Sequence, residues 1–277
     1  MKYKVVFLVI LCQFIFTKYV VAEVGLKAKF FAEIYSETTK LRREGNNTTS
    51  MTQSMQGIKI TIPKFSRVKI YLKERYGSDA NRDYWNNRGE VMLGLRLRFF
   101  QKIFLAAYFE YIQGKYFDIE NSENPNPYGL NYKDMRGGLI FWQGMDVEFK
   151  DRWTKTFPFS FWDEIYSDVT FYNKDDKNII FYMNGKAGAR LLRVYKSALD
   201  YYFINYLMYD KNADFWNNKM EFGIGFRIKP WTDLDLSLFV ETLKGTYFDR
   251  NGRYENPYSL EYSDVRIGLL FWYGIGD

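Results

Sequence analysis

The sequence predicts an all-β protein, an antiparallel transmembrane β-barrel of about 12 strands formed by an internal duplication. Three observations predict this fold. Most segments after residue 23 alternate apolar and polar side chains with a period of two, as strands with two different surroundings do. Two long stretches of the chain repeat each other. Aromatic residues make up 20% of the chain, far above the usual share, while charged residues stay at an ordinary 26%.

The segment 216–248 shows the alternation most clearly, and we expect it to form two strands joined by a tight turn. Phe222 and Ile224 share an apolar face, whereas Glu221 and Arg227 lie on the opposite face. A transmembrane barrel directs its apolar face to lipid and its polar face to the lumen, whereas a soluble sheet buries its apolar face. This hairpin alone is compatible with both arrangements.

The segment 85–117 repeats 216–248 at an offset of about 131 residues, and a fixed offset is typical of a duplication. We therefore expect two repeat halves, at about 23–145 and 146–277. Charged positions recur together with the apolar ones, so both faces of the strands are retained. The matching charged pairs are Glu90 and Glu221, Arg96 and Arg227, Arg98 and Lys229, Glu110 and Glu241, Asp134 and Asp264, and Arg136 and Arg266.

The N-terminus has the pattern of a secretory signal peptide, which we place at residues 1–22. Lysines precede an apolar run, and Ala22 offers a small-residue cleavage site. The apolar run is too short to span a membrane as a helix. Residues 23–277 are then expected to form a single barrel without cysteine, since Cys12 lies in the signal, and the fold depends on no disulfide.

The first half is expected to contain six strands. Apolar–polar alternation begins at Val24, and a run of polar residues then predicts a flexible loop over 39–56. The next strand stops before Pro63, because proline interrupts the hydrogen-bond ladder of a sheet. Residues 144–157 join the two halves. We place the six strands at 24–38, 57–62, 67–76, 88–100, 103–117 and 134–142.

The second half repeats this order, and its predicted strands are 158–173, 178–193, 197–209, 218–229, 233–248 and 263–274. Long and short connections alternate, which is typical of outer-membrane barrels with long outer loops and short periplasmic turns. An even strand count places both termini on the periplasmic side. A soluble periplasmic β domain is the alternative, although such a domain has no reason to sort its loops by length.

If the apolar faces meet lipid, the opposite faces line the lumen and carry many charges. One interpretation is an ion-pair network that braces or plugs a small barrel. The other is a polar pore with a basic bias in the first half, in which rings of charge select the solute. Neighbouring strands are expected to bring Arg96, Glu110 and Arg136 together, and the second half to repeat this trio. The pore-lining candidates are Lys69, Glu90, Arg96, Arg98, Glu110, Asp134, Arg136, Glu221, Arg227, Lys229, Glu241, Asp264 and Arg266.

Tyrosines and glycines also fall on the predicted inward face. Tyr35, Tyr71, Tyr108 and Tyr166 offer rings that either stack on sugars or pack against the wall. Glycines within strands, such as Gly94, resemble no phosphate-binding loop and are explained by barrel kinks or close packing.

We expect no enzymatic activity, no cofactor and no metal. The chain contains no histidine, which removes the commonest general base and most zinc sites. Glu90, Glu110 and Asp134 each have an arginine as the expected partner, which disfavours an acid–base pair of carboxyl groups. The net charge of +6 includes lysines of the signal, so the remaining chain is only mildly basic and we expect no nucleic-acid partner.

Two segments carry a resemblance to a known family. Residues 221–230, followed by the alternating strand 234–241, contain a Gly-x-Gly-x-Arg strand and a proline turn, and residues 263–269 continue the pattern. These segments resemble the C-terminal barrel domain of the bacteriophage adsorption protein A (NfrA-like) family and, more distantly, barrels that export exopolysaccharides. The first half shows Gly94-Leu95-Arg96 without the proline. The resemblance implies a periplasmic scaffold, which a separate protein would supply here.

Three functions follow as hypotheses for a protein of the bacterial outer membrane that is exported through a cleaved signal peptide. The first is a pore or export conduit for polysaccharide or oligosaccharide. The second is a non-transporting surface barrel, structural or used for adhesion or phage attachment, which acts through loops 39–56, 118–132 and 249–261. The third is a diffusion porin that prefers anions. The expected partners are outer-membrane lipid and lipopolysaccharide, a sugar polymer, and a separate periplasmic scaffold protein.

Overall fold

The computed structural model describes residues 27–41, 47–61, 67–81, 86–100, 103–117, 129–148, 160–173, 177–231, 235–248 and 259–275. These residues form twelve antiparallel strands that close into one barrel, so the predicted fold class is confirmed. The predicted signal peptide lies outside the described residues. The strands are β1 (Lys27–Leu41), β2 (Asn47–Thr61), β3 (Arg67–Asp79), β4 (Arg88–Arg98), β5 (Phe104–Tyr116), β6 (Asn131–Glu148), β7 (Ser160–Tyr172), β8 (Ile179–Val194), β9 (Ser197–Asp210), β10 (Lys219–Lys229), β11 (Asp235–Tyr247) and β12 (Glu261–Ile275).

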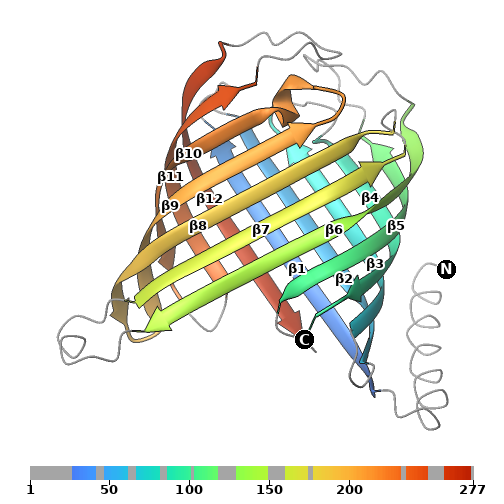
Figure 1. Ribbon diagram of the computed structural model, residues 1–277, viewed down its shortest axis with the longest axis horizontal. Coiled ribbons are helices and arrows are strands. Elements are labelled where there is room, and N and C mark those ends of the chain that lie inside the picture. The colour runs from blue at the N-terminus through green and yellow to red at the C-terminus, as the bar shows by residue number, and fades with distance from the viewer. Residues whose placement is uncertain are drawn as a thin grey trace.

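Each strand pairs with its neighbours in sequence, and β1 pairs with β12 to close the ring (Figure 1). A short 3-10 helix, η2 (Phe215–Asn217), lies between β9 and β10. No helix in the described part of the chain is long and apolar enough to cross a membrane. The start of β1 and the end of β12 lie at the same end of the barrel, which we name the terminal end. We name the opposite end the loop end.

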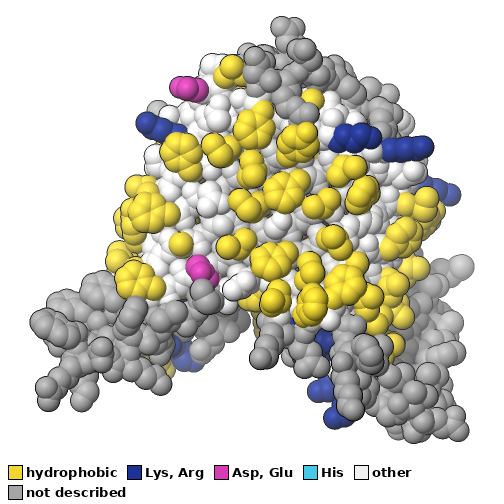
Figure 2. All heavy atoms as spheres, viewed as in Figure 1, with side chains coloured by type: hydrophobic (Ala, Val, Ile, Leu, Met, Phe, Trp, Pro, Cys, Tyr) yellow, Lys and Arg dark blue, Asp and Glu magenta, His cyan; other side chains and the backbone are white. Residues whose placement is uncertain are grey.

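Alternation along each strand separates an apolar outer face from a polar inner face. On β10, Phe222 and Ile224 point outward and are 53% and 41% exposed, whereas Glu221, next to Phe222, is 1% exposed. Figure 2 shows hydrophobic side chains spread over the face formed by β7 to β10, with lysine and arginine side chains near the rims. This arrangement is that of a transmembrane barrel with lipid outside, and it excludes the soluble alternative.

The connections follow the predicted alternation with two exceptions. At the loop end the connections span 42–46, 80–87, 117–130, 173–178, 211–218 and 248–260. At the terminal end they span 62–66, 99–103, 149–159, 195–196 and 230–234. The exceptions are the short connection 42–46 at the loop end and the long connection 149–159 at the terminal end.

The predicted loop over 39–56 is wrong, because β2 begins at Asn47 and runs through this region to Thr61. Apart from Met51, both faces of its first half are polar, so the period-two signal is missing there. The second hypothesis therefore loses one of its three loops. The predicted link 144–157 is also too long at its start, since β6 continues to Glu148.

Polar side chains interrupt the outer face on β1 and β2, and we name this surface the polar strip (Ser36, Thr38, Ser50, Thr52 and Ser54). Four of its hydroxyl groups pair across the two strands. The Ser36 and Thr52 hydroxyls lie 3.0 Å apart, as do those of Thr38 and Ser50. These bonds satisfy hydroxyl groups on a face that elsewhere meets lipid, where an unpaired polar group is costly.

The second half carries apolar side chains at three of the equivalent positions, Val169, Phe181 and Met183, and keeps a serine at Ser167. Ser36 faces Thr52 in the register of β1 and β2, and Ser167 faces Met183 in that of β7 and β8. Likewise, Phe181 stands where the first half has Ser50. The two halves therefore share a register but differ in what their outer walls present to the membrane.

Replacing Thr52 by the residue of the other half, Thr52→Met, is expected to stabilise the folded barrel by about 1 kcal/mol, because a lipid-facing side chain gains apolar surface. The urea midpoint of the purified protein in lipid vesicles measures this change. The reciprocal variant, Met183→Thr, should lower the midpoint by a similar amount. A lower urea midpoint for Thr52→Met would contradict this expectation and show that the hydroxyl groups of the polar strip stabilise the barrel.

Candidate functional site: the charged interior

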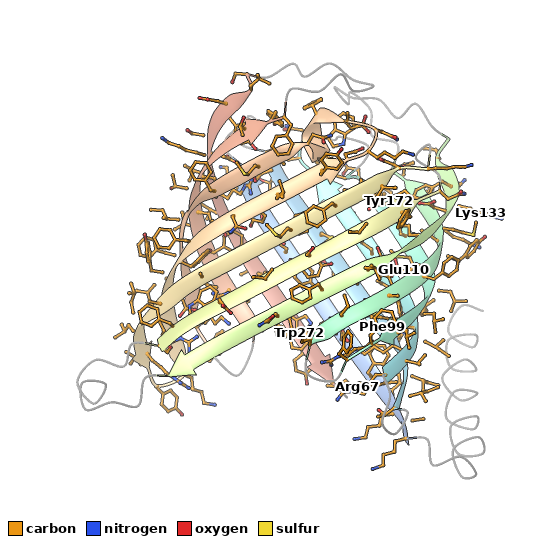
Figure 3. The ribbon with its side chains drawn as sticks, in the orientation of Figure 1. Arg67, Phe99, Glu110, Lys133, Tyr172 and Trp272 are labelled. Atoms are coloured by element: carbon orange, nitrogen blue, oxygen red, sulfur yellow. The ribbon has the colours of Figure 1, made fainter. Side chains whose placement is uncertain are left out.

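Every pore-lining candidate predicted from the sequence lies on the inward face of its strand. Figure 3 shows Arg67 toward the terminal end and Glu110 nearer the middle of the barrel. The carboxylates among the candidates are almost completely buried, with exposed fractions of 2% for Glu90 and 1% for Glu241. Such buried charges require partners, since an unpaired buried ion is strongly destabilising.

A tyrosine that crosses a glycine to reach a glutamate is the repeating element of this interior. Tyr71 on β3 lies over Gly94 on β4, and its hydroxyl donates a hydrogen bond of 2.9 Å to Glu110 on β5. A Cβ at Gly94 would lie 2.3 Å from the tyrosine ring, so the ring occupies the space of the missing side chain. This contact agrees with close packing as the explanation of Gly94.

The same Tyr–Gly–Glu unit occurs four times among the described residues, once in each direction in each half. In all four units the ring fills the space above a glycine and the hydroxyl donates to a carboxylate two strands away. The units are Tyr71–Gly94–Glu110, Tyr132–Gly114–Glu90, Tyr202–Gly225–Glu241 and Tyr262–Gly245–Glu221. Tyr71 is only 1% exposed, so it packs against the wall and is not available to a solute.

Glu90 is the centre of the charge network in the first half. Arg75 donates from Nε to its Oε2 at 2.6 Å, and Arg136 donates from Nη2 to its Oε1 at 2.9 Å. Arg88 lies 3.8 Å away, and Arg136 also reaches Asp134 at 3.2 Å. Three cations thus surround one buried carboxylate.

The partner of Glu110 differs from the prediction. Its cation is Lys73 on β3, and neither Arg96 nor Arg136 pairs with it. Arg96 lies instead over the ring of Tyr71, with 5.5 Å from its Cζ to the ring centroid. The arginine partners predicted for Glu90 and Asp134 are confirmed. The arginine partner predicted for Glu110 is wrong, because Lys73 lies on the inner face of β3 two residues after Tyr71 and both side chains donate to Glu110.

The second half repeats the network with different cations. Arg266 donates to Glu221 at 2.7 Å and to Asp264 at 3.2 Å. Glu241 has Lys186 at 3.6 Å in place of an arginine. The predicted trio of Arg227, Glu241 and Arg266 therefore does not form as a unit. Lys229 pairs with Asp235 at 3.1 Å near the terminal end.

The sequence does not predict several of the pairs in these networks. Asp200, which the alternation places on the inward face, binds Arg190 at 3.0 Å and Arg227 at 3.1 Å and is a second bridging carboxylate. The sequence also does not predict Arg75 and Lys186 as ion-pair partners of carboxylates. Arg75 continues the odd-numbered inward face of β3, so its position is readable from the alternation, but its partner depends on the strand register.

Aromatic rings on the inward face form an aromatic track, which we define as Tyr166, Tyr182 and Tyr206. The ring centroids of Tyr166 and Tyr182 lie 6.0 Å apart, and those of Tyr182 and Tyr206 lie 6.4 Å apart. All three side chains are partly exposed. Trp142 and Trp272 lie on the inward face toward the terminal end and are 47% and 38% exposed. The interior thus presents aromatic surface that its own side chains leave uncovered.

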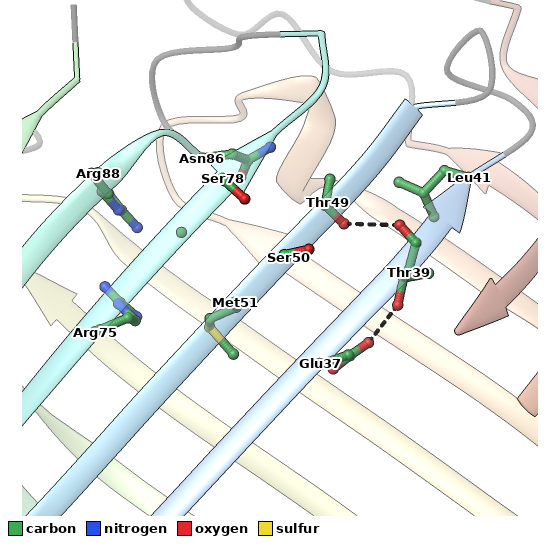
Figure 4. Close-up of a pocket in the computed structure, with 11 residues that line it drawn as sticks. Glu37, Thr39, Leu41, Thr49, Ser50, Met51, Arg75, Ser78, Asn86 and Arg88 are labelled. Atoms are coloured by element: carbon green, nitrogen blue, oxygen red, sulfur yellow. Dashed lines mark hydrogen bonds between the residues drawn. The ribbon is translucent and has the colours of Figure 1, made fainter. Parts of the chain in front are cut away.

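Two interior cavities lie at opposite ends of the described part of the barrel, and they share no lining residue. The cavity at the loop end has a volume of about 350 Å³, and Arg75, Arg88, Glu37 and Thr39 contribute to its lining (Figure 4). The cavity at the terminal end has a volume of about 220 Å³ and is lined by Arg67, Lys69, Arg96, Arg98 and Phe104.

Comparison with known proteins gives likeness of fold only. No family model and no curated sequence matches the chain, so the resemblance to the NfrA-like family stays a prediction. The β domain of the Bordetella autotransporter BrkA aligns with a TM-score of 0.35 and 10% identity, covering 88% of this chain and 98% of that chain. The translocator domain of NalP from Neisseria meningitidis aligns with a TM-score of 0.33 and 11% identity, covering 94% of each chain.

OmpT, an outer membrane protein of Vibrio cholerae, aligns with a TM-score of 0.33 and 8% identity, covering 90% of this chain and 99% of that chain. At such scores the likenesses say nothing about what this chain binds or transports.

Proposed function

We propose that the protein is a pore of the bacterial outer membrane that conducts oligosaccharide or polysaccharide chains. The observation that carries this proposal is the aromatic track, together with the exposed rings of Trp142 and Trp272 on the inward face. Aromatic side chains combine a flat apolar face with a polar edge, which suits the flat faces and hydroxyl rims of sugar rings. Arg266 lies 5.4 Å from the Tyr206 ring and adds hydrogen-bond donors beside the track.

The paired charges hold this surface in place. Each Tyr–Gly–Glu unit fixes a ring against the wall, and the surrounding cations neutralise the carboxylates. A rigid wall keeps the aromatic track in one geometry, so that a sliding chain meets the same contacts at each step. Outer-membrane barrels have their short turns in the periplasm, which places the terminal end there. Solute that leaves the periplasm then enters past Trp142 and Trp272.

A closed, non-transporting barrel is the second candidate. Near-complete burial of the paired carboxylates favours it, as does the separation of the two described cavities. The two candidates differ in one measurable property, which is the passage of ions through the folded barrel.

Single-channel conductance in a planar bilayer tests the proposal. We expect steady steps that neutral malto-oligosaccharides block in a concentration-dependent way. Trp272→Ala is expected to raise the blocking concentration about tenfold, which corresponds to the loss of one stacking contact. Trp231→Ala, at an exposed turn at the same end, removes a tryptophan of similar exposure outside the lumen and should leave the block unchanged.

Absence of conductance from folded, heat-modifiable protein would overturn the pore and favour the closed barrel. Conductance that sugars fail to block would retain a pore but overturn its saccharide substrate.

A further inference from the structure

Four cations face each other across neighbouring strands at the terminal end of the first half, and we name them the basic row. Register pairing places Lys29 opposite Lys59, Lys59 opposite Lys69, and Lys69 opposite Arg96. Like charges directly opposite each other on adjacent strands are destabilising. An uninterrupted row of four therefore opposes folding unless something compensates it.

In the second half, a carboxylate reduces the repulsion between the cations of the equivalent row. The equivalent row runs from Ser160 through Arg190 and Asp200 to Arg227. Asp200 stands where the first half has Lys69, and it binds both neighbouring arginines at 3.0 and 3.1 Å. The two rows therefore differ in charge at two positions, because Ser160 stands in place of Lys29 and Asp200 in place of Lys69.

Within the first half, a carboxylate of β1 reaches the basic row. Glu33 binds Lys69 at 2.6 Å. Among the described residues, no carboxylate lies within ion-pair distance of Arg67 or Arg96. The Nε of Arg96 is buried and makes no hydrogen bond to any residue that the structure describes.

Two members of the basic row, Lys69 and Arg96, also line a cavity. This cavity at the terminal end, about 220 Å³ in volume, is completed by Arg67, Arg98 and the ring of Phe104. Arg67 and Arg98 face each other in the register next to the basic row, and Arg98 lies over Phe104 at 5.1 Å. Guanidinium groups present planar, forked donors that match the oxygens of carboxylate and phosphate groups.

We propose that this cavity binds the phosphate or carboxylate groups of an anionic solute at the periplasmic mouth of the barrel. The bound anion supplies the negative charge that Asp200 supplies in the other half. The role of this cavity as a loading site for the pore rests on the proposed function. It implies that the saccharide that the pore conducts is anionic. Binding is nevertheless measurable without conductance.

Calorimetric titration of the folded protein in detergent with inorganic tripolyphosphate tests the site. We expect saturable binding that weakens with added salt. Lys69→Asp, which places an aspartate where the second half has Asp200, is expected to weaken binding at least about tenfold, since it removes a cation and neutralises its neighbours. Lys196→Asp makes the same change of charge in an exposed turn at the same end and should leave binding unchanged.

A second pair of variants keeps the test decisive if Lys69→Asp fails to fold. Arg67→Gln and Arg96→Gln remove charge without adding a carboxylate, and each is expected to weaken binding several-fold. Equal affinity in these variants and the wild type, or no binding by folded wild-type protein, would overturn the site. Binding without conductance would support the site and overturn the pore.

Competition separates the two sources of such anionic groups. Oligogalacturonate, a soluble chain of acidic sugars, is expected to displace tripolyphosphate. Displacement by phosphatidylglycerol micelles alone would assign the cavity to a lipid headgroup and overturn the loading site.

Discussion

Glu90→Gln is expected to lower the free energy of unfolding by roughly 3 to 5 kcal/mol, the range for removing one partner of a buried ion pair. Glutamine keeps the shape of the side chain but removes the charge that Arg75, Arg88 and Arg136 share. The three cations then lie close together, while Asp134 stays bound to Arg136. Unfolding in urea, followed by tryptophan fluorescence and by heat-modifiable mobility, measures the loss.

Two further variants show whether the loss comes from the network. Glu74→Gln makes the same change of charge on the exposed outer face of β3 and should cost little or increase stability. Adding Arg75→Gln to Glu90→Gln should recover part of the loss, because it removes one of the unneutralised cations. Equal effects of Glu74→Gln and Glu90→Gln would contradict the network as the source of stability.

Gly94→Val should be nearly as damaging, with an expected loss of about 3 kcal/mol or failure to fold, because it overfills a packed interior. A Cβ at this position meets the Tyr71 ring at 2.3 Å, and that ring is held by Glu110 and buried by its neighbours. Yield of folded barrel from refolding into detergent is the first measurement, and the urea midpoint is the second.

The clash predicts a specific rescue. Tyr71→Ala removes the ring that fills the space, so the double variant Gly94→Val with Tyr71→Ala should be more stable than the sum of its single variants. Gly137→Val serves as the control, since a Cβ there meets its nearest neighbour at an ordinary 3.5 Å. Additive effects in the double variant would place the cost of Gly94→Val elsewhere.

The sequence predicts the twelve strands because apolar and polar side chains alternate in nearly all of them. It fails over the first half of β2, where Thr49 and Gln53 on the inner face are as polar as Ser50 and Thr52 on the outer one. No alternation exists there to be detected, and the strand is recognised only through its register with β1. That the two halves arose by duplication stays a prediction from the repeated sequence.

The inward position of the charged candidates follows from the alternation of side chains along each strand. The identity of their ion-pair partners does not follow from it. A tyrosine that reaches a glutamate two strands away is set by two registers at once, and a sequence does not give these directly. The accumulation of positive charge in the basic row likewise depends on strand register. Lys69 and Asp200 occupy equivalent positions, but their neighbours become known only when Lys59 and Arg190 are placed beside them.

The seam between β1 and β12 has a consequence for how the barrel is made. It joins residues 32–41 to residues 266–275, so its hydrogen bonds form only after nearly the whole chain is present. Contacts between distant parts of a chain slow folding, because closing the intervening loop costs entropy. Until β12 arrives, β1 keeps an unpaired edge that lipid does not tolerate. Completion of the last strand is therefore the step at which a partly folded sheet becomes a membrane protein.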